Sequence, residues 1–222
     1  MKSVYFFGIL SVVLYFTVFA QNGMLNLDVM ELRNIVTARE MVSEHNWLVP
    51  TMKGEVRIAK PPLPTWLTSL PIMLTGSDDN LGAMRIPAGA AACLMVFFVY
   101  LLTSKLTCDP VISFLSAAVA ASSEFLIFMS KRASWDIFCH TFMLGAIWLL
   151  VCGWQKEKQS SRAYIFAGIL MGLSFMSKGP VSFYSLLLPF LLSYISVFGY
   201  KQIAPKWKGN LLSVMYPFTG VL

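Results

Sequence analysis

The sequence predicts an all-α membrane protein, a polytopic bundle of transmembrane helices. Hydrophobic residues make up 57% of the 222-residue chain and charged residues only 13%, with a mean hydropathy of +0.67. A soluble domain of this length cannot hide so much apolar surface, so lipid must form part of its solvent. The apolar runs lack the alternation of strands. Since backbone groups in lipid must bond within the protein, each run is expected to be a helix.

Six apolar stretches are candidates for membrane spans, since crossing the hydrocarbon takes roughly 20 residues. They are Val4–Ala20, Ile86–Thr103, Val111–Met129, Ile137–Gly153, Tyr164–Ser177 and Val181–Phe198. A seventh is expected to begin at Leu211. The four cysteines show no CxxC spacing, so neither a disulfide framework nor a zinc site is expected.

The distribution of charge predicts an orientation. Lys2 and the first apolar stretch read either as a signal peptide ending near Ala20 or, the reading we favour, as an uncleaved anchor. In both cases the loop 21–85 lies outside, and the inside segments then hold eight cations and two acids. This agrees with the positive-inside rule. The other nine of the 17 cations fall outside, three of them in the short turns SKRASW and SKGP. Short outer turns normally contain few cations, so a binding or catalytic site is expected on that face.

The large first outer loop is expected to contain amphipathic interfacial helices. Residues 26–47 predict a helix on the membrane surface. Its apolar stripe would be formed by Val29, Leu32, Ile35, Val36 and Val42. Residues 48–60 are expected to be a loop that turns at Lys53-Gly54. Residues 61–74 then predict a helix too short for a span, which is interfacial or re-entrant.

Three carboxylates on the outer face are candidates for general-base chemistry. Asp28 and Glu31 share one face of the first predicted outer helix at i, i+3 spacing. The same pair also reads as a capping box, with Asp28 at the N-cap and Glu31 at N3. Asp136 follows the SKRASW turn and reads equally as the cap of the fourth span.

Cations on the same face are candidates for holding a phosphate. Lys60 precedes two prolines that hold it extended at the membrane surface, and a snorkelling anchor is the alternative reading. Lys178 begins a Lys-Gly-Pro turn, which is also an ordinary helix stop. Lys131 and Arg132 come from SKRASW. Such cations at the lipid–water edge suit a lipid phosphate whose tail stays in the bilayer. Phosphate, unlike an alkoxide, leaves without a protonated acid.

Other polar residues have weaker readings. Arg85, at the mouth of the second span, reads as an interface anchor, with a ligand-binding role as the alternative. Glu124 lies inside the third span and either pairs with a cation or lines a cavity. His45 and His140 do not cluster with other ligands, so no zinc site is expected. A divalent cation bridging carboxylate and phosphate is compatible with these residues, although no ligand motif encodes one.

Three segments together carry a family resemblance. ELRNIVTAREMVSEHNWLVPTMKGEVRIAKPPLPTWLTSL resembles the first outer loop of bacterial C-type (GT-C) glycosyltransferases of the protein mannosyltransferase and lipid A aminoarabinose transferase family. KRASWDIF resembles that family's basic turn ending in aspartate, and GLSFMSKGP its Lys-Gly-Pro turn. One departure is that the family commonly shows an adjacent Asp-Glu pair. This chain has Met30-Glu31 at those positions, with Asp28 two residues before Met30.

The resemblance implies roles for seven residues. The catalytic carboxylates would be Glu31 and Asp136, which match the family's motifs, and Asp28, which lies two residues before the position of the family's first acid. The cations that hold the donor phosphate would be Lys60, Lys131, Arg132 and Lys178. Whether Asp28 or Glu31 acts as the base stays open. Family members are considerably longer, so residues 1–222 are expected to form a single GT-C-like domain, the N-terminal portion of a longer enzyme, with 21–85 as its outer catalytic loop.

The implied activity is an inverting transfer of a sugar from a polyprenyl-phosphate donor to a lipid or protein acceptor on the outer, periplasmic side of the cytoplasmic (inner) membrane. Nucleic acid is not an expected partner, because the cations are scattered between spans. A transporter or flippase for an anionic lipid and an inactive membrane scaffold are the alternatives. Neither the sugar nor the acceptor follows from the sequence.

Overall fold

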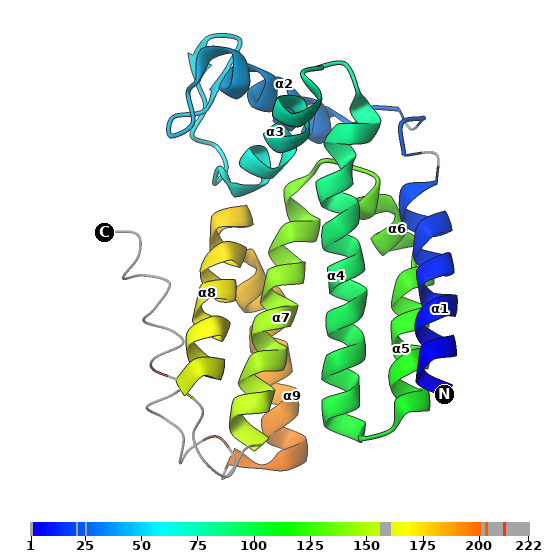
Figure 1. Ribbon diagram of the computed structural model, residues 1–222. Helices are drawn as coiled ribbons and strands as arrows, with labels where there is room; N and C mark the ends of the chain where they lie inside the picture. Colours follow the sequence, from blue (N-terminus) through cyan, green and yellow to red (C-terminus); the bar gives the residue numbers. More distant parts are fainter. Residues whose placement is uncertain are drawn as a thin grey trace.

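The computed structural model describes residues 2–20, 22–24, 26–155, 161–200, 203 and 211. A bundle of helices is covered at one end by two further helices and a short hairpin (Figure 1). The bundle consists of α1 (Lys2–Leu14) with the π-helix η1 (Tyr15–Phe19), α4 (Leu81–Thr107), α5 (Pro110–Ser122), α6 (Glu124–Ser130), α7 (Trp135–Gln155), α8 (Ser161–Lys178), the π-helix η2 (Phe183–Leu187) and α9 (Leu188–Phe198). The covering segments are α2 (Val29–Glu44), β1 (Thr51–Met52), β2 (Glu55–Val56) and α3 (Leu63–Thr75). The predicted helical class is confirmed.

Helices cover all six stretches that the sequence predicts to be spans. By length and composition, α4 and α7 can each cross a membrane. A third span results if α5 and α6, which are bent by 59° at their break, are counted as one. The apolar helices Gly8–Phe19 and Phe183–Phe198 are shorter. The number of crossings therefore stays a prediction, and the seventh stretch lies outside the described residues apart from Leu211.

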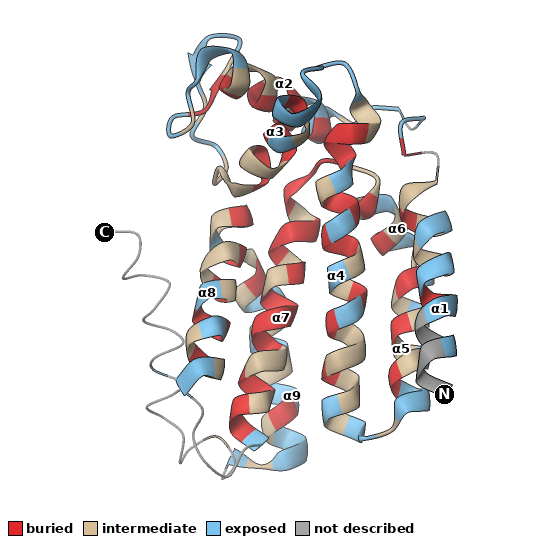
Figure 2. Ribbon diagram, in the orientation of Figure 1, coloured by how far each residue is buried: buried red, intermediate tan, exposed pale blue. Residues whose placement is uncertain are grey.

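The central helix of the bundle is α7, which packs between α4 and α8. Gly145 lets the helices approach closely, because a Cβ there would lie 2.6 Å from the Phe98 ring of α4 and 3.0 Å from Leu170 of α8. Buried positions run along α7, whereas α1 carries exposed positions along its length (Figure 2). The first turn of α7, where Asp136 lies, is thus anchored in the most buried helix of the bundle.

The segment after α2 differs from the predicted loop, because it forms a two-stranded antiparallel hairpin with Thr51 opposite Val56. The turn residues Lys53 and Gly54 both have positive φ, 58° and 76°. Such a pair of angles is the requirement of the primed turns that match the twist of paired strands. Glu40 of α2 accepts hydrogen bonds from both backbone N–H groups of this turn, which fastens the hairpin to α2.

The buried face of α2 is more polar than the predicted apolar stripe. Ile35 is buried, but Val29 and Leu32 are exposed. Asn34 is fully buried and donates to Thr68 Oγ1 of α3 at 3.0 Å and to the Ala133 carbonyl at 2.9 Å. Buried polar groups must be paired, and this side chain therefore fixes α2 against both α3 and the α6–α7 turn. That α2 lies on a membrane surface stays a prediction.

Candidate active site

A cavity of about 220 Å³, to whose lining five charged side chains contribute, lies where the covering segments meet the bundle. It is lined by Asp28, Met30, Lys60, Phe128, Met129, Arg132, Ser134, Trp135, Asp136 and Lys178. These residues come from the start of α2, the segment before α3, the α6–α7 turn and the end of α8. Five of the seven residues predicted for the site line this cavity, although they lie far apart in the sequence.

Two carboxylates of the cavity pair with two of its cations. Arg132 Nη1 lies 3.3 Å from Asp28 Oδ2, and Lys178 Nζ bonds to Asp136 Oδ1. Within the described part of the chain, no carboxylate lies within 4 Å of Lys60, whose Nζ is 5.8 Å from the Trp135 ring centroid. The cavity therefore contains one more cation than carboxylate, and Lys60 is the cation without an acidic partner among the described residues.

The helix ends explain how these side chains reach the cavity. Asp28 occupies the N-cap position of α2 with extended backbone, but its side chain makes no capping hydrogen bond. Asp136 is the second residue of α7 and bonds to Lys178 rather than capping the helix. The capping interpretations of Asp28 and Asp136 are therefore wrong. Lys178 ends α8 and Gly179 follows with φ +71°, so the expected helix stop is present and still directs the lysine to the cavity.

Glu31 does not line the cavity. Its side chain is fully buried, and its two oxygens lie 2.7 and 2.9 Å from the guanidinium of Arg85. One of these oxygens also accepts the Ala133 N–H at 3.0 Å. Arg85 in turn donates to the carbonyl oxygen of Asn22 at 2.7 Å. The interpretation of Arg85 as an interface anchor is therefore wrong, because its side chain is 0% exposed inside the protein. The pair joins α2, the start of α4 and the α6–α7 turn.

Lys131 and Glu124 also lie outside the cavity lining. Lys131 Nζ donates to the carbonyl oxygen of Ala20 at 2.9 Å, which connects the α6–α7 turn to the end of η1. Glu124 is exposed and begins α6 at the break after α5. Across the described residues, no group of three or more His, Cys, Asp and Glu side chains could hold a metal ion.

Two residues that sequence reasoning missed lie beside the site. Trp135 is 2% exposed and lines the cavity, and Arg57 lies 5.6 Å from the centroid of its ring. Arg57 donates to the Arg33 carbonyl and to Thr37 Oγ1. Burial, and then the charge of Arg33, lower the pKa of Arg57. The surroundings of the cavity are thus rich in positive charge, and no spacing in the sequence indicates that these residues meet.

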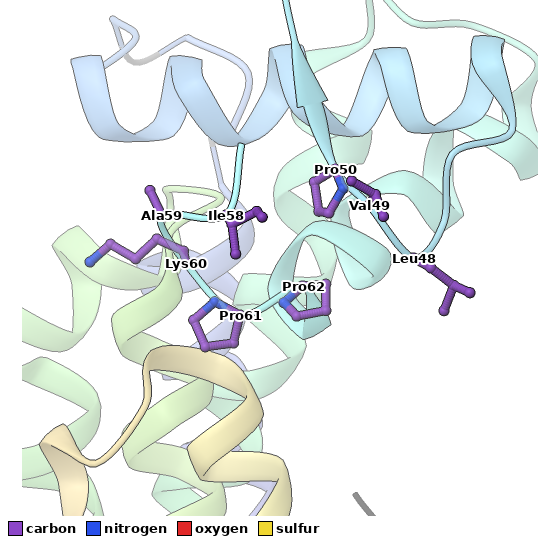
Figure 3. A pocket seen from close by; sticks show the side chains of 8 residues that line it. All are labelled: Leu48, Val49, Pro50, Ile58, Ala59, Lys60, Pro61 and Pro62. Atoms are coloured by element: carbon purple, nitrogen blue, oxygen red, sulfur yellow. The ribbon is translucent and has the colours of Figure 1, made fainter. Parts of the chain in front are cut away.

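Lys60 also lines a second pocket, of about 350 Å³, which is otherwise apolar (Figure 3). The other lining residues are Leu48, Val49, Pro50, Ile58, Ala59, Pro61 and Pro62. Leu48 and Ile58 are 85% and 82% exposed. Lys60 is thus shared by the cavity that contains the other charged side chains and by a pocket whose remaining lining residues are all apolar.

Solved structures share this architecture. ArnT from Cupriavidus metallidurans matches in the apo state with a TM-score of 0.73 and when bound to undecaprenyl phosphate with a TM-score of 0.72. Each match has 15% sequence identity and covers 97% of this chain and 40% of the other. The fold is that of an ArnT-like helical membrane protein, which confirms the predicted membrane class.

The chain belongs to the dolichyl-phosphate-mannose-protein mannosyltransferase family, whose model matches residues 59–215. Among curated relatives, an undecaprenyl phosphate-alpha-4-amino-4-deoxy-L-arabinose arabinosyl transferase of Pseudomonas savastanoi is 31% identical over 153 residues, which cover 67% of this chain and 28% of that protein. One of the same name from Edwardsiella ictaluri is 28% identical over 180 residues, covering 80% and 31%. The chain thus spans less than a third of the length of these relatives.

Proposed function

We propose that this chain forms the donor-binding and catalytic part of a membrane glycosyltransferase. The enzyme would move a sugar from a polyprenyl phosphate to a lipid or protein acceptor on the outer side of the inner membrane. The observation that carries the proposal is the shared cavity, to which separate segments contribute three cations and two carboxylates. Family membership supports the transfer reaction, and the ArnT fold bound to undecaprenyl phosphate supports a polyprenyl-phosphate donor.

Lys60, Arg132 and Lys178 would hold the donor phosphate. A phosphate accepts strong charge-assisted hydrogen bonds from such groups. Lys60 has no acidic partner within the described residues and is therefore available at once. Arg132 and Lys178 would exchange their carboxylates for phosphate oxygens. The apolar pocket beside Lys60 would offer the first isoprene units of the donor a surface of matching polarity.

The same cations would also favour the transition state. In the donor, the phosphate is a diester with one negative charge, and it leaves as a monoester that approaches two charges. Cations around it therefore bind the departing group more tightly than the ground state, which is the condition for lowering the barrier. The bond from the anomeric carbon to the phosphate oxygen breaks with its electron pair going to the phosphate, while the acceptor oxygen attacks that carbon from the opposite face.

Asp28 is the carboxylate best suited to take the acceptor's proton. It reaches the cavity, and its side chain is 44% exposed, so an acceptor hydroxyl can approach it. Both oxygens of Glu31 are instead occupied by Arg85, and one also accepts the Ala133 N–H. We assign Glu31 a positioning role, in which its bonds to Arg85 and Ala133 hold the start of α2, and with it Asp28, next to the α6–α7 turn. Asp136 would hold Lys178 until the phosphate arrives.

One observation favours the alternative of a lipid flippase, namely the 59° break between α5 and α6. Discontinuous helices form the binding sites of many transporters. Here, however, the short helix α6 leads into the cavity, which Phe128 and Met129 line. An assay of sugar transfer distinguishes the two functions, because a flippase would move the lipid across the membrane without breaking its bond to the sugar.

Lys60→Ala should weaken the binding of polyprenyl phosphate about 10-fold or more, because a hydrogen bond between charged groups contributes about 1.5–3 kcal/mol. Lys105→Ala is the matched control, since this exposed lysine lies in the last turn of α4, which is at the opposite end of the bundle (Figure 1). Dissociation constants would be measured in detergent for polyprenyl phosphate and for the uncharged polyprenol. A wild-type chain that does not prefer the phosphate, or a Lys60→Ala variant that binds it normally, would contradict the proposal.

A further inference from the structure

A chain of buried hydroxyl groups lies one helical turn away from the Asp136–Lys178 pair. Ser174 of α8 and Ser182, just before η2, are both 0% exposed. Ser174 Oγ lies 2.7 Å from the carbonyl oxygen of Cys139 on α7 and 2.6 Å from Ser182 Oγ. A carbonyl oxygen can only accept, so the Ser174 hydroxyl donates its hydrogen bond to the Cys139 carbonyl. Since Ser174 has a single O–H, Ser182 must then donate to Ser174 Oγ. The direction of both hydrogen bonds is thereby fixed.

These bonds tie together the segments that carry the ion pair. Ser174 precedes Lys178 by four residues and Cys139 follows Asp136 by three, and each separation is about one helical turn. Ser182 lies beyond the turn that ends α8, so its bond to Ser174 closes that turn from the other side. These hydrogen bonds therefore connect the end of α8 to α7 close to Lys178.

A hydroxyl group is not needed here to fill space. Alanine would occupy nearly the same volume without a buried polar atom that requires a partner. Ser177 provides the contrast, because it is also fully buried but donates only to the Leu173 carbonyl of its own helix at 2.8 Å. Ser174 differs from Ser177 in bonding across to another helix and across the turn.

We propose that Ser174 is a positioning residue of the donor site, which acts by holding Lys178 where its amine can reach the donor phosphate. This inference rests on the proposed function of the cavity. Without the Ser174 hydroxyl, the end of α8 is no longer hydrogen-bonded to the Cys139 carbonyl of α7. The Lys178 amine should then be placed less accurately for contact with the donor phosphate. The isoprenoid chain makes no use of that amine, and its contribution to binding should not change.

The test compares Ser174→Ala with Ser177→Ala in the complete chain, using polyprenyl phosphate and polyprenol as the two probes. Ser174→Ala should weaken the binding of polyprenyl phosphate about 3- to 10-fold, the range expected for the loss of one buried hydrogen bond. Its affinity for polyprenol should stay unchanged, as should both affinities of Ser177→Ala. Ser174→Thr keeps the hydroxyl and should retain most of the phosphate affinity. Ser182→Ala removes the other donor and should show the same selective loss even if Ser174→Ala does not fold.

A double-mutant cycle tests whether Ser174 acts through Lys178. In a Lys178→Ala background, Ser174→Ala should have no further effect, because the group that it positions is gone. Two independent, additive losses would overturn the inference. The inference would also be overturned if the wild type prefers polyprenyl phosphate but Ser174→Ala and Ser177→Ala bind it with equal affinity. That result would leave the proposed function intact. A wild-type chain that binds both lipids equally would overturn the proposed function and this inference together.

Discussion

Asp28→Asn should reduce sugar transfer about 10²- to 10⁴-fold, the usual contribution of a general base. Asparagine keeps the size of the side chain but cannot accept the acceptor's proton. Binding of polyprenyl phosphate should be retained or strengthened, because Arg132 loses the carboxylate that lies 3.3 Å from it and is free to bind the phosphate. A loss of turnover without a loss of donor binding is the pattern expected for a catalytic group rather than a structural one.

The measurement is the release of polyprenyl phosphate from a polyprenyl-phosphate sugar in native membranes that supply the acceptor. Asp79→Asn is the matched control, since Asp79 is 93% exposed and pairs with Arg39 at 3.7 Å. Wild-type turnover in Asp28→Asn would reject Asp28 as the base. If Glu31→Gln then lost transfer while remaining as stable as the wild type, the catalytic role would pass to Glu31.

Arg85→Met should be the most destabilising of the substitutions considered, at about 3–5 kcal/mol. It leaves the Glu31 carboxylate fully buried without its ionic partner, and removing one member of a buried pair exposes the full cost of taking the other out of water. The double substitution Glu31→Leu with Arg85→Met should recover much of the loss, because no unpaired charge then remains.

Thermal unfolding in detergent measures this effect, and Arg39→Met is the control. Asp79 is 93% exposed, Arg39 is half-buried and the paired atoms are 3.7 Å apart, so the loss of this pair should cost about 0–1 kcal/mol. Equal destabilisation by Arg85→Met and Arg39→Met would show that the buried pair does not hold α2, α4 and the α6–α7 turn together.

The sequence predicted most of the helices because each apolar run has to form one in lipid. It also indicated two of the segments that carry the cavity, since Arg132 and Lys178 sit in short outer turns where a membrane protein normally has few cations. The common feature of these segments is their place along the chain, between apolar runs, and that feature is visible without coordinates.

The contacts between distant residues were not accessible in the same way. Arg85 is 54 positions away from Glu31, and its place at the mouth of a span is equally typical of an anchor facing lipid headgroups. The choice between these readings depends on whether α2 folds back over the start of α4. The burial of Asn34 on α2 could not be predicted for the same reason, because its hydrogen-bond partners lie on α3 and on the α6–α7 turn.

The two ion pairs in the cavity have a consequence for discrimination among lipids. A membrane contains a large excess of anionic phospholipids, and a pocket of bare cations would be occupied by them most of the time. Because Asp28 and Asp136 already neutralise Arg132 and Lys178, a lipid that engages only Lys60 gains a single contact. On the proposed function, tight binding would then require a lipid whose remaining parts offset the opening of both ion pairs, so Asp28 and Asp136 would select against the other anionic lipids of the bilayer.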